Sequence, residues 1–458
     1  MSNQFELAII GAGVVGCAIA REFAKHDISI ALIDAANDVG EVTSKANTAI
    51  LHTGFDMVPN SLESRLVSQG YELLKSYAQE VNIAVEKLGG LLVAWNQIEE
   101  ENLVALQEKA VANGYHHCEI ITAEQLYKLE PNLGKGAVAA LSVPGEWIID
   151  PWSPIVAFAT QAKLAGVQVL LNTKVESITP NGDQFLLTTN NGQIKTKYLI
   201  NAAGLYSDEI DNKLGFNDFK ITPRRGELIV FDKLARSQIN HIILPVPTKM
   251  GKGVLVSPTV FGNIMLGPTA ENLADKSATG TTNVGIAGLL ERVKKIAPSL
   301  LNEEITATYA GLRAASEHSD YQIKLHTVAN HSNYLTVGGI RSTGLTASMA
   351  IALYAKKLLT QAGMSLPNEK PLPKVWMNNL GEGNQRNYQS EERIKAQPLH
   401  GQIICHCERA TTQEVLDLFA TPLPPTTLAG IGRRSRAGLG RCQGFYCHSE
   451  LRKLLEKK

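Results

Sequence analysis

A glycine-rich turn between an apolar strand and a helix opens the chain and constrains its fold more than any other feature. In FELAIIGAGVVGCAIAREFAKHDISIALIDA, Gly11, Gly13 and Gly16 have the spacing G-x-G-x-x-G, and Asp34 ends the second apolar run. Gly11 permits the tight turn, Gly13 lets the backbone approach a pyrophosphate, and Gly16 lets helix and strand pack closely. The pattern predicts a strand–helix–strand unit that binds a dinucleotide at the helix N-terminus.

Two later segments favour FAD over NAD as that dinucleotide. In YLINAAGLYSDEI an apolar strand runs into small residues at 202–204, and NYLTVGGIRSTGLTASMAIALYAKKLLTQAG reads as a strand, a glycine loop and a helix closed by Gly363. A helix N-terminus stabilises the negative charge of a reduced flavin. Asp34 is expected to accept hydrogen bonds from the adenosine ribose, and its charge opposes a 2′-phosphate.

Composition and charge narrow the classes of protein to which the chain can belong. A chain of 458 residues is expected to form two or three domains, and 44 basic against 44 acidic residues give no field that favours nucleic acid. The sequence contains no apolar run of the roughly 18–20 residues that span a bilayer, and LAII is followed by glycines instead of a cleavage site. We therefore expect a cytoplasmic protein with reduced cysteines, although it could dock at a membrane through a partner.

Four of the six cysteines lie in the last 54 residues, in the pattern C-x-C, 34 residues, C-x4-C. They are Cys405, Cys407, Cys442 and Cys447. Four thiolates can hold a [2Fe–2S] cluster or a tetrahedral zinc ion, and a unit of about 60 residues gains stability from a metal. Zinc sites more often use C-x2–4-C in both halves, so the pattern favours iron–sulfur and leaves zinc, unmetallated thiols or a disulfide as alternatives.

The front of the chain resembles the D-amino-acid-oxidase-like FAD oxidoreductases over residues 5–364. The likeness rests on IIGAGVVGCAIA, SKANTAILHTGF, YLINAAGLYSDEI and VGGIRSTGLTAS, and is closest to the glycerol-3-phosphate and L-2-hydroxyglutarate dehydrogenase groups. It implies an α/β FAD domain of the glutathione-reductase type, interleaved with an α+β substrate domain. The FAD-binding residues it implies are Gly11, Gly13, Val14, Val15, Gly16, Asp34, Thr43, Ser44, Asn47, Val175, Ala203, Gly204, Gly339, Arg341, Ser342, Thr343, Gly344, Leu345 and Thr346.

The resemblance also divides the chain. The expected FAD segments are 1–90, 140–215 and 311–364, the substrate domain takes 91–139 and 216–310, a linker takes 365–398, and a small α-rich unit takes 399–458. We call this last unit the cysteine module. The linker is rich in proline, asparagine and charge and shows no helical or strand period, as a surface strap does.

Three residues are predicted to act on the substrate. The first is His52, because a histidine side chain can take a hydroxyl proton as hydride leaves the same carbon. Arg313 in ATYAGLRAASEHSDY and Arg341 in GGIRSTGL match positions where the resembled dehydrogenases bind an anionic substrate, and two guanidinium groups can clamp a phosphate or carboxylate. Ala314 stands where the glycerol-3-phosphate branch often has proline. We expect Arg224 and Arg225 to be mainly structural.

The cysteine module resembles [2Fe–2S] domains of the bacterioferritin-associated-ferredoxin type in CHCE and RRSRAGLGRCQGFYC. The large subunits of anaerobic glycerol-3-phosphate dehydrogenases carry such a domain at the same end. Its glycines are expected to let backbone N–H groups approach the sulfurs, and its arginines to lie beside the negative cluster. TTQEVLDLFA is predicted to be a helix with Thr412 as N-cap.

The sequence therefore predicts an enzyme that accepts two electrons at FAD and passes them singly through a [2Fe–2S] centre to a protein subunit or quinone-linked partner. The expected substrate is a small anionic alcohol, with glycerol 3-phosphate first. The alternatives are L-2-hydroxyglutarate or another 2-hydroxy acid, an amine or imino acid, and a non-catalytic FAD- and metal-containing sensor.

Overall fold

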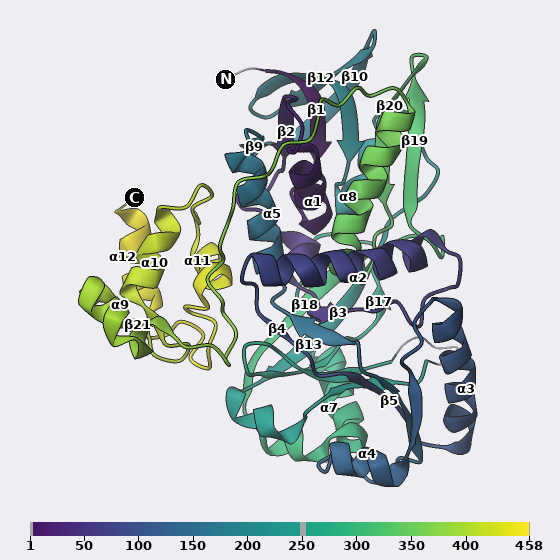
Figure 1. The fold of residues 1–458 in the computed structure, drawn as a ribbon, viewed down its shortest axis with the longest axis vertical. Coiled ribbons are helices and arrows are strands. Elements are labelled where there is room, and N and C mark those ends of the chain that lie inside the picture. The colour runs from purple at the N-terminus through teal and green to yellow at the C-terminus, as the bar shows by residue number, and fades with distance from the viewer. Residues whose placement is uncertain (1–2, 248–252, 458) are drawn as a thin grey trace.

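The computed structural model describes residues 3–247 and 253–457. Two large sheets lie one above the other in Figure 1, and the cysteine module stands beside them. Helix α2 runs across the middle of the view, between the upper and the lower sheet, and packs against α8. The predicted α/β and α+β architecture is confirmed.

The upper sheet has a parallel centre formed by the glycine-turn unit. β12 and β2 flank β1 in parallel, β9 extends the edge beside β2, and β20 is added in parallel to the end of β12. All four residues of β2 and the last four of β1 are buried, as expected for strands covered on both faces. The strands of this sheet are β1 (Gln4–Ile10), β2 (Ile30–Ile33), β9 (Gln168–Leu170), β10 (Val175–Asn181), β11 (Gln184–Thr189), β12 (Gly192–Asn201), β19 (Gln322–Val328) and β20 (His331–Gly338).

The lower sheet collects strands from distant parts of the chain. β18 pairs along the length of β13 and therefore belongs to this sheet, although it crosses the predicted boundary between residues 310 and 311. Its strands are β5 (Gly90–Ala94), β6 (Glu119–Thr122), β7 (Ala139–Val143), β13 (Thr222–Phe231), β14 (Ile242–Pro245), β15 (Leu255–Pro258), β16 (Ile264–Gly267), β17 (Glu271–Asn272) and β18 (Ile305–Ala315). A small sheet of β3 (Ile50–Leu51), β4 (Val85–Glu86) and β8 (Trp147–Ile149) is separate from both.

The helices cover the two sheets and form most of the module. Helix α8 ends two residues before Gly363, whose positive φ of 96° suits a helix stop. The helices of the main body are α1 (Val14–Phe23), α2 (Leu62–Glu80), α3 (Gln97–Ala112), α4 (Ala123–Leu129), α5 (Ser153–Leu164), α6 (Ser207–Asn212), α7 (Asn283–Ile296) and α8 (Gly344–Gln361).

Residues 365–398, the strap, run along the surface from α8 to the module (Figure 1). Backbone hydrogen bonds fix the strap at intervals: Lys370 N–H donates to the carbonyl of Lys25 and Met377 N–H to that of Val81. The side chain of Gln161 donates to the carbonyl of Pro373 at 2.9 Å. The strap is thus an ordered connection, with the short helix α9 (Glu391–Ala396) near its end.

The cysteine module contains a two-stranded ribbon and three helices: β21 (Ile403–Cys405), β22 (Ala410–Thr411), α10 (Thr412–Phe419), α11 (Leu428–Ser435) and α12 (His448–Glu456). The N-cap of α10 is Thr411 and not Thr412, so that prediction was wrong by one residue. Thr411 forms a capping box with Glu414, because its hydroxyl and the Glu414 carboxylate each accept the other's backbone N–H. The module has its own small core around Val415, Ile431 and Leu451.

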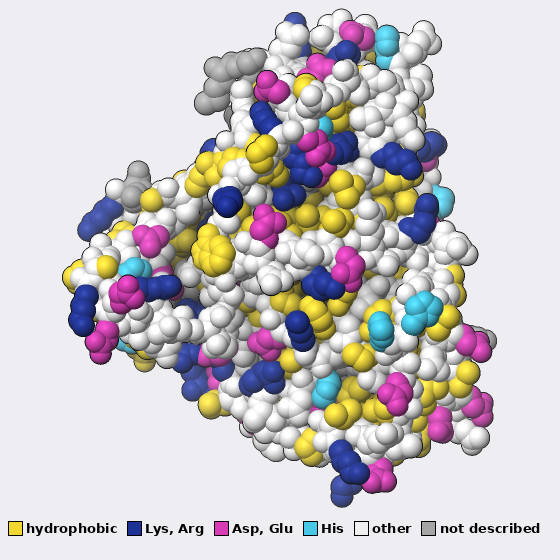
Figure 2. All heavy atoms as spheres, in the orientation of Figure 1, with side chains coloured by type: hydrophobic (Ala, Val, Ile, Leu, Met, Phe, Trp, Pro, Cys, Tyr) yellow, Lys and Arg dark blue, Asp and Glu magenta, His cyan; other side chains and the backbone are white. Residues whose placement is uncertain are grey.

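Positive and negative side chains intermingle over the face drawn in Figure 2, as the equal numbers of acids and bases predict. No helix among the described residues is long and apolar enough to cross a bilayer.

Candidate functional site

A cavity of about 1230 Å³ lies where the glycine turn, the loop after β2 and strands β13 and β18 converge. We call it the main cavity. It brings together the three residues predicted to act on the substrate, His52, Arg313 and Arg341. The predicted FAD-binding residues that line it are Gly13, Val14, Val15, Thr43, Ser44, Asn47, Gly204, Arg341, Ser342, Thr343, Gly344 and Leu345.

The glycine turn has the geometry expected of a pyrophosphate-binding turn. Gly11 has φ of 107°, and a Cβ there would lie 2.3 Å from the carbonyl oxygen of Ala202 on the neighbouring strand segment. A Cβ on Gly16 would lie 1.8 Å from the carbonyl oxygen of Gly11, so helix and turn meet backbone to backbone. At the N-terminus of α1 the Ser44 hydroxyl accepts the N–H of Val14 at 3.0 Å, whereas no side chain of the described residues caps the N-terminus of α8. Two helix N-termini therefore line one cavity, which suits a diphosphate and a flavin ring.

Asp34 lies at the end of β2, where a ribose is expected. Its two carboxylate oxygens accept hydrogen bonds from the backbone N–H groups of Ala12, at 2.6 Å, and Ala36, at 2.8 Å. Burial raises the pKa of Asp34 in spite of these bonds. The remaining predicted FAD-binding residues do not line the main cavity; these are Gly11, Gly16, Asp34, Val175, Ala203, Gly339 and Thr346. Val175 is buried in β10, and its assignment to FAD stays a prediction.

His52 is held by an acid that the sequence did not single out. Its Nδ1 lies 2.9 Å from Oε2 of Glu146, whose side chain is completely buried. The other oxygen of Glu146 accepts hydrogen bonds from the backbone N–H and the hydroxyl of Thr53. A carboxylate at Nδ1 selects the tautomer with its proton on that nitrogen, which leaves Nε2 free to accept a proton. His52 N–H also donates to the Thr346 hydroxyl at 3.1 Å, which fixes the backbone.

Arg313 and Arg224 lie side by side in the main cavity. They occupy directly opposed positions of β18 and β13, and both line the cavity. Burial, followed by the positive charge of Arg224, lowers the pKa of Arg313 to about 10. Among the described residues, no ion pair to a carboxylate involves either guanidinium. Arg225 instead pairs with Glu271 at 2.5 Å and does not line the cavity, in agreement with its predicted structural role.

Arg341 lines the same cavity but already has a carboxylate partner. Its Nη2 lies 2.8 Å from Oε2 of Glu63 and also donates to the carbonyl of Ser319. Glu63 in turn accepts the hydroxyl of Thr343 just before α8. Because Glu63 offsets its charge, the assignment of Arg341 to the substrate anion stays a prediction.

The four cysteines of the module form two pairs of neighbouring thiols. Cys405 interacts with Cys447, and both are buried, whereas Cys407 interacts with Cys442, and both are partly exposed. Among the described residues, no group of three or more His, Cys, Asp or Glu side chains is arranged to hold a single metal ion. A two-iron cluster held by four cysteines fits two adjacent thiol pairs.

Backbone N–H groups face these sulfurs, as predicted from the glycines. The N–H of Gly438 donates to Sγ of Cys405 at 3.5 Å. Although burial opposes the effect, hydrogen bonds from the backbone of Tyr446, the Cys407 thiol and further backbone groups lower the pKa of Cys442. A Cβ on Gly440 would lie 2.4 Å from Cβ of Cys407, so a larger residue would push this cysteine away.

The arginines of the module bind carboxylates. The sequence analysis had instead predicted that they would lie beside the cluster and offset its negative charge. Arg434 makes two hydrogen bonds of 2.7 Å to Asp38, and Arg433 binds both Asp38, at 2.9 Å, and Glu41, at 2.5 Å. Asp38 and Glu41 belong to the loop that continues into Thr43 and Ser44 of the main cavity. The module is therefore docked on the FAD domain, beside the loop that lines the cavity.

A second contact continues this interface. Arg436 binds Glu408 and lies over the rings of Phe261, at 4.2 Å, and Trp152, at 5.7 Å. The Trp152 ring stacks on the ring of Phe261. Its Nε1–H donates a hydrogen bond of 3.1 Å to the carbonyl oxygen of Lys45. Trp152 thus packs between the loop of the main cavity and the module.

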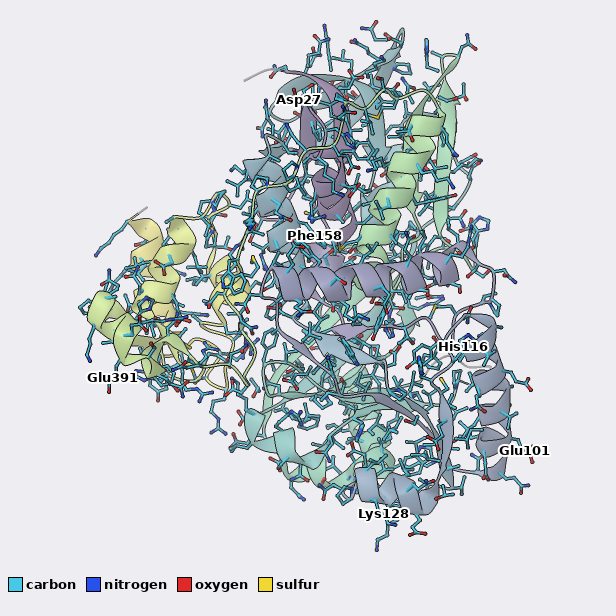
Figure 3. The ribbon with its side chains drawn as sticks, viewed as in Figure 1. Asp27, Glu101, His116, Lys128, Phe158 and Glu391 are labelled. Carbon is cyan, nitrogen blue, oxygen red and sulfur yellow. The ribbon has the colours of Figure 1, made fainter. Side chains whose placement is uncertain are left out.

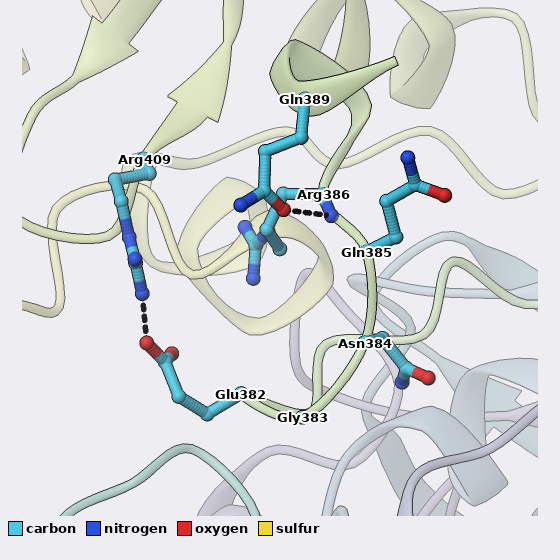
Figure 4. Close-up of a pocket in the computed structure, with 7 residues that line it drawn as sticks. All are labelled: Glu382, Gly383, Asn384, Gln385, Arg386, Gln389 and Arg409. Atoms are coloured by element: carbon cyan, nitrogen blue, oxygen red, sulfur yellow. Dashed lines mark hydrogen bonds and ion pairs between the residues drawn. The ribbon is translucent and has the colours of Figure 1, made fainter.

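The strap and the module enclose a smaller cavity of about 380 Å³ (Figure 4). Arg409 pairs with Glu382 across it, and the side chain of Gln389 accepts the backbone N–H of Arg386. Glu382 also binds Lys233 of the lower domain at 2.8 Å. These contacts fasten the strap to both of its neighbours.

The fold and the two sites define a flavin-dependent oxidoreductase with an added iron–sulfur module. The two helix N-termini and the glycine turn fit FAD, and the paired thiols fit a [2Fe–2S] cluster. A family model described as FAD dependent oxidoreductase matches residues 6–358, and one described as BFD-like [2Fe-2S] binding domain matches residues 403–457. The chain belongs to the FAD dependent oxidoreductase family.

Several characterised proteins are similar to this chain. A glycerol 3-phosphate dehydrogenase of Caloramator mitchellensis is 35% identical over 99% of this chain and 94% of its own length. A human mitochondrial L-2-hydroxyglutarate dehydrogenase is 31% identical over 59% of this chain and 61% of its own. The structure of L-alpha-glycerophosphate oxidase from Mycoplasma pneumoniae with FAD bound is 32% identical, covers 81% of this chain and 97% of its own, and superimposes with a TM-score of 0.74.

Proposed function

We propose that the chain oxidises the secondary alcohol of glycerol 3-phosphate to a ketone and exports the electrons through a [2Fe–2S] centre to a partner protein or quinone-linked acceptor. The observation that carries this proposal is a single cavity that holds an oriented base, His52, and an arginine, Arg313, with no carboxylate partner among the described residues. A phosphorylated secondary alcohol offers a proton to the first and an anion to the second.

His52 is positioned to take the hydroxyl proton at Nε2. Glu146 holds the imidazole by Nδ1 and stabilises the imidazolium that forms when the proton arrives. Oxidation of the alcohol also breaks a C–H bond whose electron pair leaves as hydride, and bound FAD supplies the acceptor for it. The proton and the hydride together account for the two hydrogens lost in forming the ketone.

Arg313 is proposed to hold the substrate phosphate. Its guanidinium lies close above Gly226, because a Cβ at that glycine would be 2.8 Å from Nη2. Holding the anion at a fixed place orients the alcohol carbon, and such orientation can supply several kcal/mol of the barrier. Arg341 is proposed to lie near the flavin while it stays paired with Glu63.

Two features support export through the module. The cysteine module is docked beside the loop that lines the main cavity, and the Caloramator relative, named a dehydrogenase, matches nearly the whole chain, module included. A [2Fe–2S] centre carries one electron at a time, which an enzyme that gave its electrons to oxygen would not require.

A second candidate is the oxidation of L-2-hydroxyglutarate or another 2-hydroxy acid. It is favoured by the similarity to L-2-hydroxyglutarate dehydrogenases and by Ala314, which lines the cavity where proline is common in the glycerol-3-phosphate branch. Both substrates present an anion and a secondary alcohol, so the same base and arginine can serve either.

The proposal is tested by anaerobic purification, iron and zinc assays, and anaerobic mixing with substrates. Glycerol 3-phosphate should bleach the flavin faster than L-2-hydroxyglutarate or any amino acid, and the protein should hold about two irons per chain. Cys442→Ser should lower the iron content, whereas Cys118→Ser, at a cysteine outside the module, should not. Bleaching by L-2-hydroxyglutarate alone would select the second candidate. Bleaching by an amine would end the alcohol proposal, and no bleaching at all would favour a sensor.

A further inference from the structure

Strand β13 presents alternate residues to the main cavity, and β18 lines the cavity beside it. On β13, Arg224, Gly226 and Leu228 line it, while Arg225 and Glu227 do not. Arg224 is directly opposite Arg313 in the antiparallel register, and Gly226 is opposite Gly311. Side chains opposite each other on neighbouring antiparallel strands emerge on the same face with Cβ atoms about 5 Å apart. Both guanidinium groups therefore project from one patch of the cavity wall.

The hydrogen bonds of both arginines leave their terminal nitrogens available. Arg224 uses Nε to donate to Oδ1 of Asn272 at 2.8 Å, which holds the side chain but leaves both Nη groups without a partner in the described ranges 3–247 and 253–457. Arg313 makes only a long contact of 3.5 Å from Nη1 to the carbonyl of Thr269 within those ranges.

Two like charges on directly opposed residues destabilise a strand pair unless an anion lies between them. The pKa of Arg313 is lowered by burial and then by Arg224, and within residues 3–247 and 253–457 no carboxylate pairs with either guanidinium to offset this repulsion. Lys109 and Arg292 also line the cavity, from α3 and α7, but neither lies on the strand pair that carries Arg313.

We infer that Arg224 is the second anion-binding residue of the site and that the Arg224–Arg313 pair selects a dianionic phosphate monoester over a monoanionic carboxylate. The inference rests on the proposed function, because it assumes that Arg313 binds the substrate anion. Two guanidinium groups can each donate two hydrogen bonds to phosphate oxygens, whereas one already satisfies a carboxylate. In this arrangement Arg224 replaces Arg341 as the partner of Arg313, and Arg341 remains bound to Glu63.

The test uses the FAD-containing enzyme and glycerol 2-phosphate, a phosphate monoester without a secondary hydroxyl. Its Kd is measured anaerobically from the change in flavin absorbance, so no turnover is required. Arg224→Met should raise this Kd about ten- to hundredfold, the range expected from losing charged hydrogen bonds. Arg224→Lys should recover part of the loss, because the charge remains but the forked geometry does not. Arg225→Met, at the neighbouring residue outside the cavity, should stay within about twofold of the wild type.

A pH series adds a second readout. Phosphate monoesters lose their second proton near pH 6, so the Kd of the wild type should fall as pH rises through about 6. Arg224→Met should flatten this dependence, which a residue that only supports the fold would not do. If Arg224→Met does not yield folded protein, Arg224→Gln, which also removes the charge, provides the same comparison.

The outcomes separate the inference from the proposed function. An Arg224→Met Kd within twofold of the wild type, or an equal rise in Arg225→Met, overturns the role of Arg224. If Arg313→Met raises the Kd while Arg224→Met does not, only this inference fails. If neither variant changes the Kd, the anion lies elsewhere and the proposed function fails with it.

Discussion

The main cavity and the cysteine module use the same side chain in opposite ways. In the cavity, Arg224 and Arg313 face each other, and neither pairs with a carboxylate among the described residues. At the edge of the module, Arg433 and Arg434 are both buried and both bind Asp38. The first pair is proposed to bind a ligand, and the second pair holds two parts of the chain together. The neighbours of an arginine, and not its place in a basic stretch, decide its role.

The largest effect is expected from replacing His52, the proposed proton acceptor in the main cavity. His52→Gln should lower the rate of anaerobic flavin reduction about a thousandfold, because it removes the proton acceptor while keeping a polar side chain. The measurement is stopped-flow absorbance with saturating substrate. His116, an exposed residue outside the cavity that is labelled in Figure 3, provides the matched control, and His116→Gln should keep the wild-type rate. A loss smaller than about tenfold in His52→Gln would mean that another group takes the proton.

The second-largest effect is expected at the buried pair of Arg434 and Asp38, at the edge of the module. Arg434→Met should destabilise the docked module by about 3–5 kcal/mol, because it leaves the buried carboxylate of Asp38 with one partner fewer. Urea unfolding gives the free energy, and protease cleavage in the strap reports detachment of the module. The double variant Asp38→Asn with Arg434→Met should lose less than the sum of the single losses. Additive losses would mean that the two side chains act independently.

Two aspartates on the same loop should respond to pH with opposite signs. Burial raises the pKa of Asp38, but the hydrogen bonds and charges of Arg434 and Arg433 outweigh it and lower the pKa overall. Its contribution to stability is therefore present above the unfolded pKa of about 3.9 and is lost as pH falls through the folded value. Burial raises the pKa of Asp34, so its charged form costs stability, and this cost disappears as pH falls through the raised value.

Unfolding free energies of Asp38→Asn and Asp34→Asn, measured between about pH 3 and 6, check this contrast. Relative to the wild type, Asp38→Asn should be least stable at the upper end of the range, and Asp34→Asn should gain stability there. Shifts of the same sign in both variants would contradict the assignment of Asp38 to the interface.

The smallest effect is expected at an exposed pair on α12. Lys453 contacts Glu450 one turn earlier at 2.7 Å, and both side chains are more than half exposed. Lys453→Ala should change the free energy of unfolding by less than about 0.5 kcal/mol. A loss comparable with that of Arg434→Met would show that burial is not what separates the two kinds of pair.

Several features of the molecule could be predicted from the sequence because short-range geometry dictates them. Gly11 and Gly16 lie so close to neighbouring backbone atoms that a residue with a Cβ does not fit there. Their spacing in the sequence therefore predicts the turn. The glycines of the module likewise predicted the approach of backbone N–H groups to the sulfurs. The sequence spacing grouped Cys405 with Cys407, whereas in the structure Cys405 lies beside Cys447. The N-cap of α10 was misplaced by one residue, since Thr411 and Thr412 are alike locally and only the capping box with Glu414 distinguishes them.

The tertiary structure decided which distant groups meet. Glu146 is 94 residues from His52, and Asp38 is 396 residues from Arg434, so no local pattern connects either pair. The register of β13 on β18 likewise brought Arg224 opposite Arg313 and left Arg341 to Glu63. Local rules depend on a few neighbouring residues, whereas long-range pairing depends on how whole sheets and helices pack. The sequence by itself therefore determined the glycine turn, the four clustered cysteines and the family. The packing of the chain decided which thiols pair and which arginines bind a carboxylate.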